Sequence, residues 1–125
     1  MPIDATLPYD DQNIFAKILR GEIPNRTVFE DEWALAFHDI NPLAPVHVLV
    51  IPKGAYVSWD DFSARASEAE IAGFVRAVGQ VARDQSLTQP GYRLLANVGQ
   101  HGHQEVPHLH VHLFGGRPLG PMLAR

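Results

Sequence analysis

The 125-residue sequence contains no cysteine and only two tryptophans and two methionines. Without cysteine the chain has no disulfide, no thiolate ligand for zinc and no cysteine nucleophile. Cysteine-free chains suit the reducing cytoplasm, and we expect this protein to be cytoplasmic. Any nucleophile or acid–base group therefore has to come from another residue type.

Long apolar runs and strongly basic tracts are missing as well. No segment approaches the roughly 18–20 apolar residues that span a bilayer. The N-terminus lacks the basic and apolar parts of a signal peptide. Ten Lys or Arg residues stand against fourteen Asp or Glu, a formal net charge of −4. We therefore expect neither a membrane nor a nucleic-acid partner, although one small nucleotide needs only a few local donors.

Histidine is what the sequence has in excess. There are seven histidines, and five of them fall within twelve residues: His101, His103, His108, His110 and His112. Imidazole is the side chain that exchanges protons near neutral pH. This cluster is therefore the first place to look for chemistry.

The length and the hydrophobic content of 46% indicate one domain with a real core. Residues 1–9 carry two prolines and no periodic pattern, which predicts a flexible N-terminal arm before a single domain over residues 10–125.

Apolar periodicity predicts a helix from Asp11 to about residue 20 and another over about residues 68–85. Strands are predicted over residues 27–30, 33–39, 47–51, 92–97 and 108–114. Few crossover helices favour antiparallel pairing, so the class is α+β with the helices on one face of the sheet.

The last predicted strand alternates histidine with apolar residues. Leu109, Val111 and Leu113 should enter the core, and His108, His110 and His112 should line the opposite face. A merely polar outer face is one interpretation, and a metal site that adds His47 is another. The outer histidines lie about 13 Å apart and cannot share one ion. Acid–base and nucleophilic work along a phosphorus substrate is the interpretation that uses all three.

The loop before this strand, residues 97–106, contains Gly99 and Gly102. Glycines free main-chain N–H groups to turn toward an anion. The loop matches no standard phosphate-binding motif. The loop is nevertheless a candidate for anion binding, because it leads directly into the histidine strand.

The segment His108-Leu-His-Val-His-Leu-Phe114 resembles the His-φ-His-φ-His-φ-φ signature of the histidine triad (HIT) family, where φ is apolar. Residues 15–24, 36–40, 44–53 and 115–123 are similar to the Hint branch of that family. The resemblance covers about residues 12–123. His103 departs from it, since glycine is usual at that position.

This resemblance implies a five-stranded antiparallel sheet with two helices, paired into a homodimer. It also implies hydrolysis of purine nucleoside 5′-phosphoramidates through a nucleotidyl-histidine, with no metal and no cofactor. A HIT hydrolase of diadenosine polyphosphates and a nucleotide-binding regulatory protein are the alternatives.

The resemblance also assigns expected roles to individual residues. His110 would be the nucleophile, His112 would assist the leaving group, and His108 with His47 would orient the site and relay protons. Asp39 would hold the ribose hydroxyls. The remaining nucleotide contacts would be an apolar slot for the base, made by Ile14, Phe15, Ile18, Phe37 and Ile40, and phosphate contacts from Asn97, Gln104 and the main chain of Glu105 and Val106.

Overall fold

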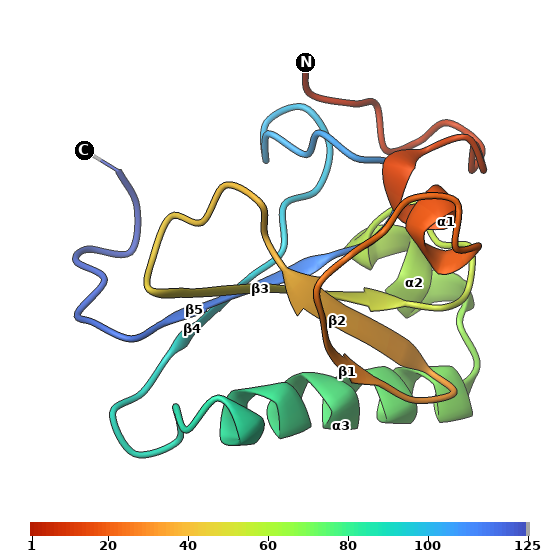
Figure 1. Ribbon diagram of the computed structural model, residues 1–125. Helices are drawn as coiled ribbons and strands as arrows, with labels where there is room; N and C mark the ends of the chain where they lie inside the picture. Colours follow the sequence, from red (N-terminus) through yellow and green to blue (C-terminus); the bar gives the residue numbers. More distant parts are fainter. Residues whose placement is uncertain (125) are drawn as a thin grey trace.

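The computed structural model describes residues 1–124, and its centre is one five-stranded antiparallel sheet (Figure 1). The strands lie side by side in the order β1-β2-β3-β5-β4. Their bounds are β1 Thr27–Glu30, β2 Ala34–His38, β3 Val46–Pro52, β4 Arg93–Leu95 and β5 Val111–Gly115. The predicted α+β class and five antiparallel strands are confirmed.

Three helices accompany the sheet: α1 Ile14–Leu19, α2 Trp59–Arg65 and α3 Glu68–Asp84. The long helix α3 runs along one face, and α1 lies over the other (Figure 1). The expectation that the helices share one face was therefore wrong. Within residues 1–124, no helix has the length and apolar character needed to cross a membrane.

The sequence of the central strands explains why both faces are covered. Alternate residues such as Ala36 and Val50 join the core beneath α3. Their neighbours Phe37 and Leu49 join a second cluster with Phe15 of α1. A strand that is apolar at every position is buried on both faces, and a strand exposed on one face alternates instead.

The short helices begin at polar caps. Helix α1 starts after Asn13, whose side chain accepts a hydrogen bond from the Ala16 N–H, and so two residues later than the predicted cap Asp11. It ends before Gly21, whose φ of +78° is a left-handed conformation that favours glycine. Helix α2 was not predicted, because Phe62 is its only buried residue and leaves no apolar stripe.

The last two strands are shorter than predicted. The β5 ladder begins at Val111, so His108 to His110 precede it. The alternation continues through this extended segment, because Leu109, Val111 and Leu113 are all buried in the α3 core. The histidines between them face the α1 side of the sheet.

Helix α3 begins with the predicted capping box, in which the Ser67 side chain accepts from the Glu70 N–H and the Glu70 side chain accepts from the Ser67 N–H. We expect Ser67→Ala to lower the free energy of unfolding by about 1 kcal/mol, because one donor at the helix start loses its partner. Urea unfolding followed by circular dichroism measures this. Ser63→Ala, on the exposed side of α2, is the matched control and should stay within about 0.5 kcal/mol of the parent. An equal loss in both variants would contradict the assignment.

Candidate active site

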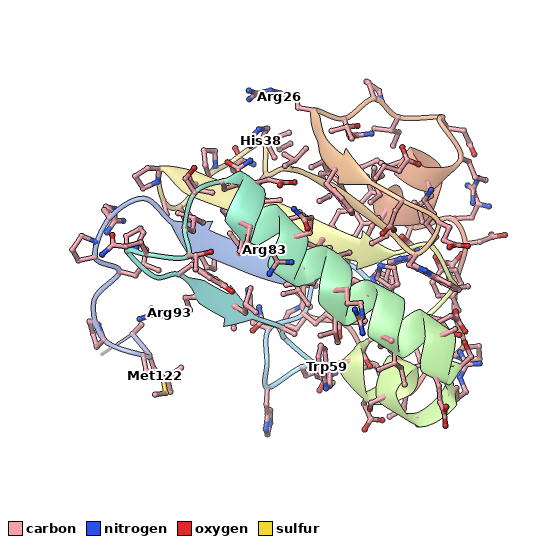
Figure 2. The ribbon with its side chains drawn as sticks, turned by 90° about the horizontal axis from the view of Figure 1, so that it is seen from below. Arg26, His38, Trp59, Arg83, Arg93 and Met122 are labelled. Carbon is pink, nitrogen blue, oxygen red and sulfur yellow. The ribbon has the colours of Figure 1, made fainter. Side chains whose placement is uncertain are left out.

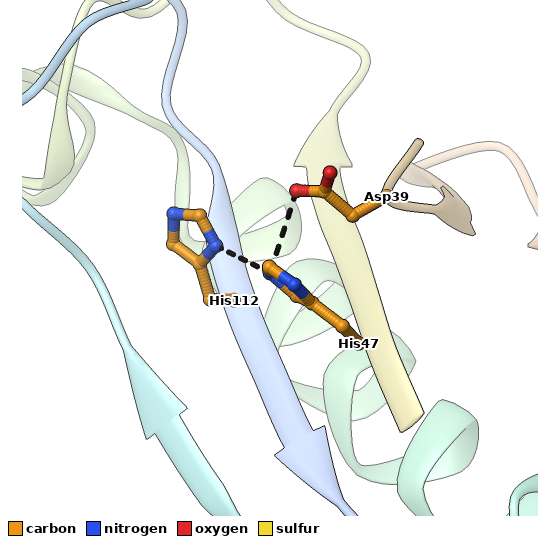
Figure 3. A group of neighbouring side chains, drawn as sticks. All are labelled: Asp39, His47 and His112. Carbon is orange, nitrogen blue, oxygen red and sulfur yellow. Dashed lines mark hydrogen bonds and ion pairs between the residues drawn. The ribbon is translucent and has the colours of Figure 1, made fainter. Parts of the chain in front are cut away.

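His47, His112 and Asp39 form a compact group on the α1 side of the sheet (Figure 3). His47 comes from β3 and His112 from the neighbouring strand β5. The His47 Nε2 atom lies 2.9 Å from His112 Nδ1 and 3.4 Å from Asp39 Oδ2. The ring of Phe114 packs against both histidine rings and fixes their tilt.

Hydrogen bonds determine where the protons of this pair reside. The main-chain N–H of Leu43 donates to His47 Nδ1 over 3.1 Å, so the proton of the neutral His47 ring is on Nε2. That proton is donated to His112 Nδ1. The neutral His112 ring therefore carries its own proton on Nε2. This N–H takes no part in the bonds from Leu43 to His47 and from His47 to His112.

His110 has the opposite arrangement. Its Nδ1 lies 2.8 Å from the main-chain oxygen of His108, and a carbonyl oxygen only accepts, so Nδ1 carries the proton. The Nε2 atom then holds a free lone pair. The ring of Phe15 packs edge-on against the His110 ring, with the two centroids 5.0 Å apart. The ring is thus oriented with a nucleophilic nitrogen available.

His108 is fully buried and uses both ring nitrogens inside the protein. Its Nε2 donates to the main-chain oxygen of Pro52 at 2.9 Å. Its Nδ1 lies 2.6 Å from the hydroxyl of Tyr9, which must therefore be the donor. With both nitrogens occupied, the side chain of His108 is suited to holding its own segment in place.

Burial keeps these four imidazoles neutral at pH 7. The pKa of His108 is lowered from 6.5 to about 4, chiefly by burial and in smaller part by the nearby His110 ring, while the bond to the Pro52 oxygen opposes this shift. Burial followed by the neighbouring His110 and His47 rings lowers the pKa of His112 to about 4. Burial also lowers the pKa of His47, partly opposed by Asp39. It lowers the pKa of His110 as well, opposed first by the bond to the His108 oxygen and then by Asp39. A neutral nucleophile is therefore available without a strong base.

A cavity of about 540 Å³ adjoins the histidines beneath α1. Asp39 and Phe15 line it and also contact the histidine group. The structure places eight of the ten predicted nucleotide-binding residues around this one cavity: Ile14, Phe15, Ile18, Phe37, Asp39, Ile40, Glu105 and Val106.

The other two predicted contacts do not line the cavity. Gln104 is fully buried, and its amide bonds the main chain at Gly99, Val57 and Val106, so it braces the 97–106 loop from inside. Asn97 lies at the start of the same loop and is half-buried. Gln104 therefore shapes the loop in this structure.

The loop itself folds tightly on its own main chain. A Cβ atom at Gly102 would lie 2.6 Å from the Val98 oxygen, so the close approach requires glycine. His103 has a φ of +59°, a left-handed conformation in which glycine is the unstrained residue. Its ring pairs with the Glu105 carboxylate at 3.0 Å, which holds that side chain at the surface.

Sequence reasoning missed several residues of this region. Asn25, Arg26 and His38 line the cavity, and Figure 2 shows Arg26 and His38 close together at the upper edge of the view. Their positions at strand ends carried no motif. Tyr9 lies in a segment without periodicity, so its contact with His108 had no sequence signal.

The group Asp39, His47 and His112 is also the one set of neighbouring metal-ligand side chains found in residues 1–124, with ligand atoms within 4.8 Å of one another. It includes one histidine of the triad, His112, together with His47 and Asp39.

Comparisons with known proteins show which family the chain resembles. The HIT domain family model matches residues 20–119. The chain is 67% identical to a 13.2 kDa HIT-like protein of Azospirillum brasilense, with 94% of this chain and 96% of the relative covered. It is 44% identical to the purine nucleoside phosphoramidase of Escherichia coli K12, covering 91% and 95%. A HIT family hydrolase from Clostridium thermocellum superimposes with a TM-score of 0.82 and 39% identity, covering 92% and 99%.

The lowered pKa values predict how stability depends on pH. Below pH 6.5 the unfolded chain binds more protons than the folded one, because folded His108 and His112 stay neutral down to about pH 4. The free energy of unfolding should therefore fall between pH 6.5 and about 4. Urea titrations at several pH values measure this slope.

We expect His112→Asn to reduce that slope, since one of the two groups is removed. His101→Asn is the matched control, because its ring is exposed to solvent, and it should keep the parent slope. If the unfolding free energy of His112→Asn changed with pH as steeply as that of the parent, His112 would have the same pKa in the folded and unfolded states.

Proposed function

The chain belongs to the HIT domain family, and on that premise we propose that it hydrolyses purine nucleoside 5′-phosphoramidates, with His110 as the nucleophile. The observation that carries the proposal is the free Nε2 lone pair of His110, fixed by the bond from Nδ1 to the His108 oxygen. The 44% identity to a purine nucleoside phosphoramidase supports this choice of substrate class over a diadenosine polyphosphate.

The first step forms a bond between His110 Nε2 and phosphorus while the bond from phosphorus to the leaving nitrogen breaks. An incoming anionic phosphate favours uptake of one proton by the His47–His112 pair, and the Asp39 carboxylate beside His47 favours it too. His112 Nε2 then gives this proton to the leaving nitrogen, which departs as an amine.

The second step releases the nucleotide. Water attacks the nucleotidyl-histidine from the side that the amine has left. His112 has given up its Nε2 proton and is neutral with its remaining proton on Nδ1, so its Nε2 accepts a proton from the water. The new oxygen–phosphorus bond replaces the bond to His110 Nε2, which regains its lone pair. The overall change is the addition of one water across the phosphorus–nitrogen bond.

The cavity supplies binding for the rest of the substrate. Apolar side chains from α1 and β2, Ile18 and Phe37 among them, suit the faces of a purine. One carboxylate oxygen of Asp39 accepts from the Asn41 N–H at 2.8 Å, which fixes the group that we assign to the ribose hydroxyls. The adjoining main chain of Glu105 and Val106 is assigned to the phosphate.

We expect His110→Ala to reduce turnover of adenosine 5′-phosphoramidate by at least about a thousandfold, because the attacking atom is lost. Binding of AMP, measured by calorimetry, should persist. Acid quench and mass spectrometry should detect a nucleotidyl adduct on the parent chain and none on the variant. His101→Ala, in the exposed part of the loop, is the control and should keep full turnover. Turnover by His110→Ala close to that of the parent would refute the nucleophile, and a preference for diadenosine polyphosphate would refute the substrate class.

We also propose that the protein forms a homodimer through α3 and β4. A groove of about 530 Å³ lies between them and is lined almost wholly by apolar residues. Large side chains remain exposed there, including Val75, Leu94 and Val98. Strand β4 is also an edge of the sheet, with main-chain groups free to pair. A second copy would cover the apolar surface and the edge together.

Sedimentation at micromolar concentration should therefore give about twice the monomer mass of 13.8 kDa. We expect Leu94→Glu to sediment as a monomer, because a carboxylate would enter the apolar contact. Leu43→Glu is the matched control, since Leu43 is exposed in another loop away from this groove, and it should remain dimeric. A parent chain of monomer mass would contradict the dimer.

A further inference from the structure

Tyr9 contacts the histidine group from a segment that precedes the residues matched by the family model. The matched region begins at residue 20, whereas the Tyr9 hydroxyl lies 2.6 Å from His108 Nδ1. The Tyr9 ring also meets the His108 ring in an edge-to-face arrangement, with centroids 5.6 Å apart. The N-terminal segment thus supplies a donor to an imidazole that is otherwise sealed inside the protein.

The bond from Tyr9 matters because His108 carries the carbonyl that orients His110. This carbonyl lies before the β5 ladder, so sheet hydrogen bonds do not hold it. Three other bonds hold the segment: Leu109 N–H to the Tyr56 oxygen at 2.8 Å, His108 Nε2 to the Pro52 oxygen at 2.9 Å, and the Tyr9 hydroxyl to His108 Nδ1. Tyr9 provides one of the two bonds that fix the His108 ring.

Tyr9 is itself held in place by the turn that starts α1. The Asn13 side chain caps α1 and also donates to the Asp10 oxygen at 2.8 Å. The Gln12 N–H donates to the Asp10 carboxylate at 2.9 Å. The residue next to Tyr9 is therefore tied to the helix whose Phe15 contacts the His110 ring. The turn places the hydroxyl and Phe15 on the same histidine pair.

We propose that Tyr9 is a positioning residue for the hydrolysis: its hydroxyl holds His108, whose main-chain oxygen orients His110 for attack. This inference rests on the proposed function, in which His110 is the nucleophile. Without the hydroxyl, His108 Nδ1 would be a buried acceptor with no donor, and the segment would shift to find one. A shift of the carbonyl turns the His110 ring away from the line of attack.

Tyr9→Phe tests this, since it removes only the hydroxyl and keeps the ring. We expect kcat for adenosine 5′-phosphoramidate to fall about tenfold with KM unchanged, because orientation is lost and substrate contacts are kept. In nitrogen NMR the chemical shift of the unprotonated His108 Nδ1 should move toward the value of an imidazole nitrogen that accepts no hydrogen bond. The His110 Nδ1 proton should exchange faster with solvent.

Thr6→Val is the matched control, because it removes a hydroxyl from the same segment. Among residues 1–124 that hydroxyl bonds only to Asp4. It should keep the parent kcat and both NMR signatures. A parent-like kcat in Tyr9→Phe would overturn the inference. So would a kcat loss with both signatures unmoved, which would show a structural effect alone. If the parent chain itself fails to turn over the substrate, the proposed function falls, and the His110 Nδ1 exchange rate still decides whether Tyr9 holds this pair.

Discussion

The hydrogen bond from His110 Nδ1 to the main-chain oxygen of His108 is the contact on which the site depends. It decides which nitrogen of His110 has a lone pair, and it aims that nitrogen away from the protein main chain. A second, independent chain of bonds, from Leu43 through His47 to His112, decides that the adjacent donor is an N–H. The lone pair on His110 Nε2 and the N–H on His112 Nε2 are thus each determined by a main-chain group, the His108 oxygen for the first and the Leu43 N–H for the second.

The sheet explains how three buried imidazoles and the half-buried His112 can share one face. Burying an imidazole is costly unless its nitrogens find partners. In residues 1–124 every fully buried side-chain nitrogen or oxygen has a partner, so the free Nε2 atoms of His110 and His112 are those that are not fully buried. Apolar residues of β2 and β3 continue that face beyond the histidines and pack under α1. The same packing that excludes water lowers the pKa of the histidines, so stability and the neutral form of the nucleophile have one cause.

The sequence predicted the parts of this fold that follow from repeating patterns. Alternation placed the histidines opposite Leu109, Val111 and Leu113, and Ser67 with Glu70 marked the start of α3. What it missed depends on contacts between distant segments. Whether one or both faces of the sheet are covered could be predicted only by knowing where α1 packs. Helix α2 buries only Phe62 and so has no apolar stripe. The Tyr9 contact with His108 spans 99 positions of the sequence. The family resemblance supplied the residues around the cavity, since no local pattern links Ile14 to Val106.

Neutral histidines also determine how this site would treat a nucleotide. The cavity is bordered by Asp39 and Glu105, and its cationic side chain Arg26 is exposed. A phosphate here would meet N–H dipoles from the main chain and from imidazole rather than a cluster of fixed positive charges. Such dipoles stabilise negative charge only at the positions toward which they point. They therefore stabilise the transition state at phosphorus more than the released nucleotide. A site built in this way binds through the nucleoside and reacts at the phosphate, so the net charge of −4 and a nucleotide substrate are compatible.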